Sequence, residues 1–101
     1  MGYSLKLLPI VYNDLREAKK WYNEKKEHLG KEFKQAVNRE FNYIKAYPEH
    51  YQRKYKELRQ SLVARFPYAI FYLIQESKKQ IIIFGVLHTS RNPEIVRSRI
   101  K

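Results

Sequence analysis

"RFPYAIFYLI", from Arg65 to Ile74, is the segment of this chain with the strongest strand character. β-Branched and aromatic residues dominate it, as they do in buried strands. Pro67, within this segment, separates the strand of residues 68–75 from the one before it, because proline interrupts a β ladder. A polar turn, "ESKK" at residues 76–79, and a second apolar run, "QIIIFGVLH" at residues 80–88, follow directly. This order predicts a hairpin of strands 68–75 and 80–88, with the second strand central in a sheet.

Two amphipathic helices are expected before this hairpin. Apolar residues recur three or four positions apart, which gives a helix one buried face. They are Val11, Leu15, Ala18 and Tyr22 in residues 10–28, and Phe33, Ala36, Val37, Phe41 and Ile44 in residues 31–46. The first helix starts either at a cap formed by Asn13 or Asp14 or just after Pro9. Gly30 is expected at the C′ position that ends it, and Pro48 ends the second helix.

Two further strands complete the expected fold. Residues 3–8 alternate moderately and indicate a short N-terminal strand. Residues 55–66 alternate more clearly: Leu58, Leu62, Ala64 and Phe66 share one parity, and Arg59, Ser61 and Arg65 share the other. The predicted class is α+β, with an N-terminal strand, an αα-hairpin and a three-stranded antiparallel meander. We expect the helix pair to cover one sheet face, Leu62 to be buried, and Arg59 and Arg65 to lie on the uncovered face.

Size and composition favour one small soluble domain over residues 1–101. Hydrophobic residues make up 44% of the chain, which is too apolar for a disordered protein. Cysteine is absent, which excludes disulfides and thiolate chemistry and suits a reducing compartment. Residues 1–12 lack the pattern of a signal peptide, and no apolar run approaches the ~20 residues that span a bilayer. The expected location is the cytoplasm, with no membrane association.

The net charge of +11 favours a polyanionic or acidic partner. The excess is uneven, because residues 1–47 hold 10 basic and 6 acidic residues, whereas residues 48–101 hold 11 and 4. No histidines and carboxylates have metal-ligand spacing, so neither a metal nor a cofactor is expected. A helix-turn-helix or RNP-type signal is also absent, which weakens the case for a plain nucleic-acid-binding module.

Four segments of the chain together resemble the RelE/ParE superfamily. These are the toxins of bacterial type II toxin–antitoxin modules, also described as plasmid stabilisation proteins. The order and spacing of the segments carry the resemblance, above all Arg-Phe-Pro-Tyr followed by a strand and then His-x-x-Arg-x-Pro. The segments are "NDLREAKKWYNEKKEHLGKEF" (13–33), "YIKAYPEHY" (43–51), "LRQSLVARFPYAIFY" (58–72) and "VLHTSRNP" (86–93).

This resemblance implies an αα-hairpin on a small, mostly antiparallel sheet, together with a cognate antitoxin whose segment wraps the toxin. An acidic wrapping segment would suit so basic a protein. The superfamily holds two activities. RelE-like members are ribosome-dependent endoribonucleases that cleave mRNA, and ParE-like members bind and poison DNA gyrase without catalysis. The chain could also be an inactive relative.

A metal-independent nuclease would need a proton shuttle, cations and stacking rings. His88 is the natural shuttle, and Arg65 and Arg91 would complete the catalytic set. A target- or nucleic-acid-binding surface would use the same three residues together with Lys54, Lys56, Arg59, Tyr68 and Tyr72. The interpretation that we favour is structural: His88 hydrogen-bonds at a strand end and orders the residues that follow.

The Arg-Phe-Pro-Tyr entry and the His-x-x-Arg-x-Pro ending look closer to the ParE-like branch. Two departures also leave the catalytic set of the nuclease incomplete. RelE-like nucleases typically carry an arginine within the strand that here reads "PYAIFY", where this chain has Ala69 and Ile70. They also have a tyrosine after the last strand, and this chain has none there. Binding gyrase needs no matched pKa values, so these absences do not count against it. The other large aromatic residues are expected in the core: Trp21, Phe33, Phe41, Phe66, Phe71 and Phe84.

Overall fold

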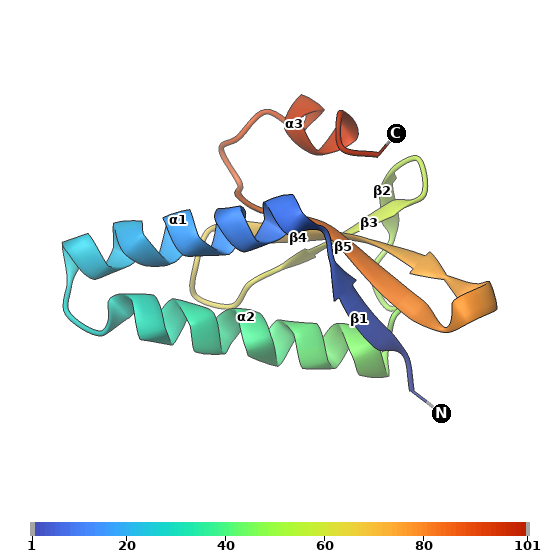
Figure 1. Ribbon diagram of the computed structural model, residues 1–101, viewed down its shortest axis with the longest axis horizontal. Helices are drawn as coiled ribbons and strands as arrows, with labels where there is room; N and C mark the ends of the chain where they lie inside the picture. The colour runs from blue at the N-terminus through green and yellow to red at the C-terminus, as the bar shows by residue number, and fades with distance from the viewer. Residues whose placement is uncertain (1, 101) are drawn as a thin grey trace.

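The computed structural model describes residues 2–100 and has two long helices packed on a five-stranded sheet (Figure 1). The strands are β1 (Ser4–Leu7), β2 (Arg53–Tyr55), β3 (Leu58–Leu62), β4 (Tyr68–Gln75) and β5 (Gln80–His88). The helices are α1 (Pro9–Lys25), α2 (Leu29–Ala46), a 3₁₀ turn η1 (Glu76–Lys78) and the short α3 (Glu94–Arg97). None of the helices within residues 2–100 is long and apolar enough to cross a membrane.

The sheet is mixed, with strand order β1-β5-β4-β3-β2. β4 and β5 form the expected antiparallel hairpin, and β3 also pairs with β4 in an antiparallel arrangement. β1 instead pairs with β5 in parallel, from Ser4 opposite Gln80 to Leu7 opposite Ile83. The α+β class is therefore confirmed, and the predicted meander becomes part of a mixed sheet.

Helix α1 begins at Pro9, whose fixed φ suits the first turn of a helix. Asn13 and Asp14 thus lie inside the helix. Gly30 is not a helix terminator, because it lies in the first turn of α2, and His28 takes the left-handed conformation with φ 70°. A Cβ on Gly30 would lie 2.4 Å from Asn23 Oδ1 and 2.7 Å from the Lys19 carbonyl oxygen. Glycine at this position therefore permits the close approach of the two helices.

The segment predicted as one strand over 55–66 is a hairpin followed by a loop. β2 and β3 pair through a tight turn in which Lys56 has φ 54°, and Arg65 has φ 73° in the loop before β4. Both turns use non-glycine residues at positive φ, so no glycine marks either turn in the sequence. The expected continuous alternation is broken at these two points.

The side chains of β3 point opposite to the expectation. Arg59 pairs with Tyr72 and Ser61 with Ile70, and residues directly opposite each other share a sheet face. Tyr72 and Ile70 belong to the core under the α1–α2 hairpin. Arg59 and Ser61 therefore face the helix side, where Ser61 is buried and its hydroxyl has no hydrogen-bond partner within residues 2–100.

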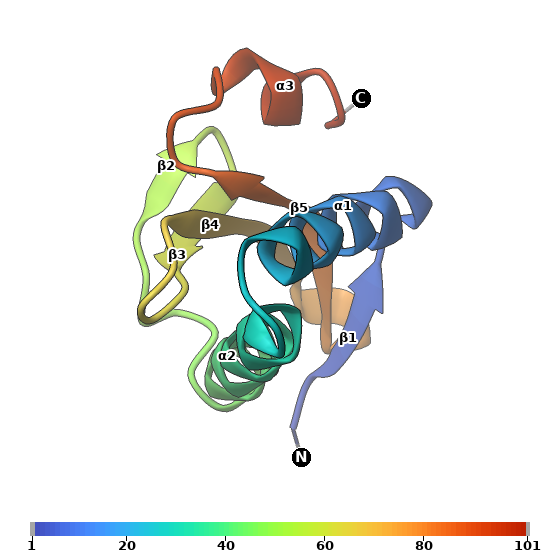
Figure 2. The ribbon, with the colours of Figure 1, turned by 90° about the vertical axis from the view of Figure 1, so that its left-hand side faces the viewer.

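The second sheet face is not left open. Leu58, Phe71, Phe84 and Leu87 form a second apolar cluster there with Val96 of α3. Figures 1 and 2 show α3 on the opposite side of β4 and β5 from α2. The expectation of an uncovered face that carries arginines is wrong, because this face is apolar and the C-terminal segment covers it. Leu62 lies outside the cluster and is 58% exposed, contrary to the prediction that it is buried.

Leu58 and Leu62 should therefore respond differently to truncation. Leu58→Ala should lower the free energy of unfolding by about 2–5 kcal/mol, because Leu58 is fully buried. Leu62→Ala should change it by less than about 0.5 kcal/mol, as expected for an exposed side chain. Urea unfolding of the two variants measures both values, and equal losses would show that the burial of β3 is wrongly described.

Candidate functional site

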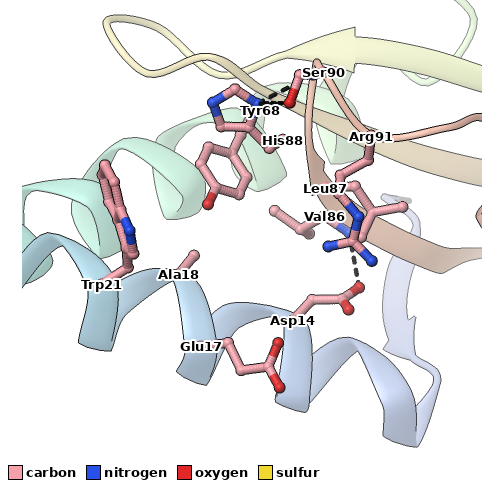
Figure 3. Close-up of a pocket in the computed structure, with 10 residues that line it drawn as sticks. All are labelled: Asp14, Glu17, Ala18, Trp21, Tyr68, Val86, Leu87, His88, Ser90 and Arg91. Carbon is pink, nitrogen blue, oxygen red and sulfur yellow. Dashed lines mark hydrogen bonds between the residues drawn. The ribbon is translucent and has the colours of Figure 1, made fainter.

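A pocket of about 390 Å³ lies between helix α1 and the C-terminal end of β5 (Figure 3). One wall comes from α1, and the other comes from β4, β5 and the residues that follow β5. The lining residues are Asp14, Glu17, Ala18 and Trp21 on α1, Tyr68 on β4, Val86, Leu87 and His88 on β5, and Ser90 and Arg91 beyond it. The sequence singled out three of these residues for function: Tyr68, His88 and Arg91.

Trp21 forms the outer part of the α1 wall and is not a core residue. Its side chain is 51% exposed, whereas the neighbouring Tyr22 is buried. A helix turns by about 100° per residue, so the residue beside a buried position points away from it. The Trp21 ring packs edge-on against Tyr22 at 5.0 Å between centroids, and Lys25 Nζ lies 4.7 Å from the Trp21 centroid. The pocket thus has an exposed aromatic surface held in place by its neighbours.

His88 and Tyr68 lie side by side because they are directly paired across β4 and β5. Their ring centroids are 5.3 Å apart in an edge-on arrangement. The Ser90 backbone N–H donates to His88 Nδ1 at 3.0 Å, and the Ser90 hydroxyl lies 2.8 Å from the same nitrogen. A neutral imidazole that accepts at Nδ1 carries its proton on Nε2. His88 is therefore oriented as a hydrogen-bond donor at its free nitrogen.

Tyr68 points its hydroxyl toward α1 in Figure 3. Burial raises the pKa of Tyr68, and the nearby Tyr22 adds to the rise. The positive charge of Arg91 lowers this pKa and partly offsets these effects. The Tyr68 hydroxyl is accordingly protonated at neutral pH and can donate a hydrogen bond into the pocket.

Asp14 anchors the base of the pocket. Its Oδ2 accepts from the Val86 backbone N–H at 3.1 Å and from Arg99 Nη1 at 2.8 Å, and its Oδ1 accepts from Arg99 Nη2 at 3.1 Å. Arg99 Nη1 also donates to the Phe84 carbonyl oxygen at 3.0 Å. The Asp14 side chain is 8% exposed and that of Arg99 is 15% exposed. This buried ion pair joins α1, β5 and the C-terminal segment.

The sequence places Asp14 on the buried side of α1, although Asp14 is interpreted only as a possible helix cap. Asp14 lies three residues after Val11 and four before Ala18, so it shares the buried stripe of α1. A carboxylate on that stripe needs a partner, because an unpaired buried charge is strongly unfavourable. The partner could not be found from spacing, since Arg99 lies 85 residues away along the chain.

The other predicted site residues lie elsewhere. Tyr72 is fully buried, its hydroxyl donates to the Pro48 carbonyl oxygen at 2.7 Å, and burial raises its pKa to about 12. Its prediction as an exposed stacking residue is therefore wrong. Arg65 pairs with Glu32 of α2 at 3.1 Å and does not line the pocket. Lys54, Lys56 and Arg59 belong to the β2–β3 hairpin, where Arg59 Nη1 donates to the Tyr51 carbonyl oxygen at 2.6 Å.

No cluster of three or more histidine, cysteine, aspartate or glutamate residues with metal-binding geometry occurs within residues 2–100. The chemistry available in the pocket is that of hydrogen bonds, aromatic contacts and charge. Trp21, Tyr68, His88 and Arg91 supply these groups on two facing walls. Such a set suits recognition of a partner, where aromatic and arginine side chains contribute strongly.

The sequence matches the family model of the ParE toxin of the type II toxin–antitoxin system, parDE, over residues 5–93. The chain belongs to this family. Membership in the ParE toxin family makes it a toxin of the RelE/ParE superfamily and implies a cognate antitoxin partner. The matched region includes every residue of the pocket. A comparison with curated protein sequences finds no significant match.

Solved structures share the fold of this ParE toxin family member at low sequence identity. The chromosomal ParDE system of P. aeruginosa contains a chain with TM-score 0.70 and 17% identity, covering 85% of this chain and 95% of that one. A mutant of E. coli RelE in the free state gives 0.71 and 14%, covering 98% and 94%. The isolated E. coli RelE toxin gives 0.66 and 12%, covering 95% and 94%. Both branches of the superfamily therefore have this fold.

Arg91 should be needed for toxicity but not for folding. Its side chain is exposed on the pocket rim and has no ion-pair partner within residues 2–100. Arg91→Ala should therefore relieve growth inhibition on expression in bacteria, and should change the free energy of unfolding by less than about 0.5 kcal/mol.

Arg39→Ala is the matched control, because Arg39 is an exposed arginine on α2 outside the pocket. This variant should remain as toxic as the parent chain at equal soluble expression. Full toxicity of Arg91→Ala, or an equal loss of toxicity in both variants, would show that the pocket has no specific role in toxicity.

Proposed function

We propose that this toxin acts in the ParE manner, by binding and poisoning DNA gyrase. The observation that carries the proposal is the match to the ParE toxin family over residues 5–93. The pocket supports it, because its exposed Trp21 and Arg91 and its half-buried Tyr68 and His88 suit a protein–protein contact. In this proposal these four side chains contact the target directly, and the α1 wall supplies shape and a carboxylate, Glu17, at the rim.

The positions of the nuclease candidates also support a non-catalytic mechanism. A nuclease would need Arg65 near His88 and Arg91, yet only His88 and Arg91 line the pocket. His88 Nδ1 already accepts from the Ser90 N–H, which leaves the protonated Nε2 and no free basic nitrogen. A general base must be able to take a proton from the reacting hydroxyl.

Other arginines that follow β5 are engaged in the structure. Arg97 pairs with Glu94 at 2.7 Å, and Arg99 pairs with Asp14. Ala69 and Ile70 occupy the strand positions at which RelE-like nucleases carry an arginine, and both are buried in the sheet. A cation at either position would require a different core.

The antitoxin partner of this toxin is proposed to carry an acidic segment. A net charge of +11 steers acidic chains toward the toxin and speeds association at low salt. Both parts of the sequence carry a positive excess, 10 basic against 6 acidic residues in 1–47 and 11 against 4 in 48–101. A long wrapping segment would meet it better than a compact one.

The target can be identified by pulse labelling after the toxin is expressed without its antitoxin. We expect DNA synthesis to stop first, with gyrase–DNA cleavage complexes accumulating, while mRNA remains intact. In vitro, the purified toxin should inhibit supercoiling by gyrase, and Arg91→Ala should inhibit it less.

The opposite order of events would contradict the proposal. Early loss of protein synthesis with fragmented mRNA would assign a RelE-like nuclease instead. Undisturbed growth at high soluble expression would indicate an inactive relative. The matched Arg39→Ala control separates the loss of a contact from a general effect of reduced charge.

A further inference from the structure

A second surface gathers aromatic and basic groups at the end of α2 and on the β2–β3 hairpin. It includes a hollow of about 430 Å³ lined by His50, Tyr51, Gln52, Arg53, Lys54, Gln60 and Leu62. This hollow shares no lining residue with the pocket at His88. Its residues lie on different elements from those of the pocket, so the two surfaces can be tested separately.

The aromatic part of this surface is a chain of four rings in contact. Tyr43 lies 5.0 Å from Tyr47 and 5.3 Å from His50, and His50 lies 4.8 Å from Tyr51 between ring centroids. The Tyr43 hydroxyl and His50 Nδ1 are 3.0 Å apart, within hydrogen-bond distance. Tyr47 is 58% exposed, and His50 is also exposed. Large aromatic side chains exposed in this way are candidates for stacking with a partner.

The segment that carries these rings is fixed in place by three hydrogen bonds. The buried Tyr72 hydroxyl donates to the Pro48 carbonyl oxygen at 2.7 Å. Arg59 Nη1 donates to the Tyr51 carbonyl oxygen at 2.6 Å, and the Tyr51 hydroxyl donates to Glu40 Oε2 at 2.7 Å. The rings are therefore held in position before any partner arrives, which reduces the entropy lost on binding.

The charge around the hollow is positive. Arg53 and Lys54 line it, and no carboxylate among residues 2–100 does so. Acidic side chains lie around its edge: Glu40 accepts from the Tyr51 hydroxyl at 2.7 Å, and Glu49 and Glu57 line a separate hollow with Arg53. Glu57 makes a 3.7 Å exposed contact with Arg53. Lys54 is exposed and has no ion-pair partner within the described chain. It is thus available to an anion.

We propose that this surface binds a single-stranded nucleic acid. Proteins that bind single strands combine aromatic platforms for the bases with cations for the phosphates. His50 lines the hollow, and the exposed Tyr47 lines a neighbouring hollow that also contains His50; these two rings provide the platforms. Lys54 and Arg53 provide the cations, and the amides of Gln52 and Gln60 can hydrogen-bond base edges. An acidic peptide would use the cations but would have no need of the stacked rings. The proposal is independent of gyrase poisoning.

The test is fluorescence anisotropy of the purified chain with labelled oligonucleotides of about 12 nucleotides, one of deoxythymidine and one of uridine. Both should bind, and a marked preference for one would identify it as the natural class. Lys54→Ala should weaken binding and reduce the slope of log K against log salt by about 0.7, as expected for one lost phosphate contact on a single strand. His50→Ala should weaken binding about 5- to 150-fold, the range for one lost stacking contact.

Lys20→Ala is the charge-matched control, since Lys20 is an exposed lysine on α1 away from this hollow. Its binding should stay within about twofold of the parent chain. The proposal fails if neither oligonucleotide binds, if Lys20→Ala and Lys54→Ala weaken binding equally, or if a polyglutamate peptide competes and His50→Ala has no effect. Thermal unfolding of each variant separates a lost contact from a lost fold. Gyrase is absent from the assay, so its outcome leaves the proposed target untouched.

Discussion

Asp14 places a carboxylate inside the interface between α1 and the sheet, where an unpaired charge would cost more than a small domain can spare. Arg99 meets both carboxylate oxygens, and the Val86 N–H and Phe84 carbonyl complete the set of partners. Val86 lies beyond the stretch of β5 that pairs with β1, so its N–H is available to a side chain. The requirement to pair Asp14 thus joins α1, the unpaired edge of β5 and the last residues of the chain.

This constraint shapes both faces of the sheet. On the helix side it holds α1 against the end of β5, and the pocket between them inherits its two walls from that contact. On the other side, the contact of Arg99 with Asp14 holds the residues after α3 against β5. Val96 of α3 packs on Leu58, Phe71, Phe84 and Leu87. Gly85 is part of the arrangement, because a Cβ there would lie 3.1 Å from Arg99 Nη1. The pocket residues Tyr68, His88 and Arg91 therefore depend on the segment around Arg99, which does not itself line the pocket.

The sequence predicted the elements whose signals are local. The apolar stripes of α1 and α2 and the hairpin of β4 and β5 follow from periodicity and turn residues. The alternation of apolar residues on β3 predicted the wrong side chains for the helix-covered face. Both sheet faces are apolar, so the alternation alone does not tell which face the helices cover. Trp21 is predicted in the core because of its large apolar ring. It is exposed, because the helix turns its side chain away from the buried side that holds Tyr22. Of the eight predicted site residues, Tyr68, His88 and Arg91 line one pocket and the other five lie elsewhere. The pairing of Arg99 with Asp14 is a long-range contact without any local pattern.

A double-mutant cycle between Asp14 and Arg99, measured by urea unfolding, tests this central ion pair most directly. Asp14→Asn and Arg99→Gln should each lower the free energy of unfolding by about 3–5 kcal/mol, because each leaves the other group buried without its charge partner. The double variant should lose clearly less than the sum, giving a coupling energy above about 1 kcal/mol. Additive losses, with a coupling within about 0.5 kcal/mol of zero, would contradict the account.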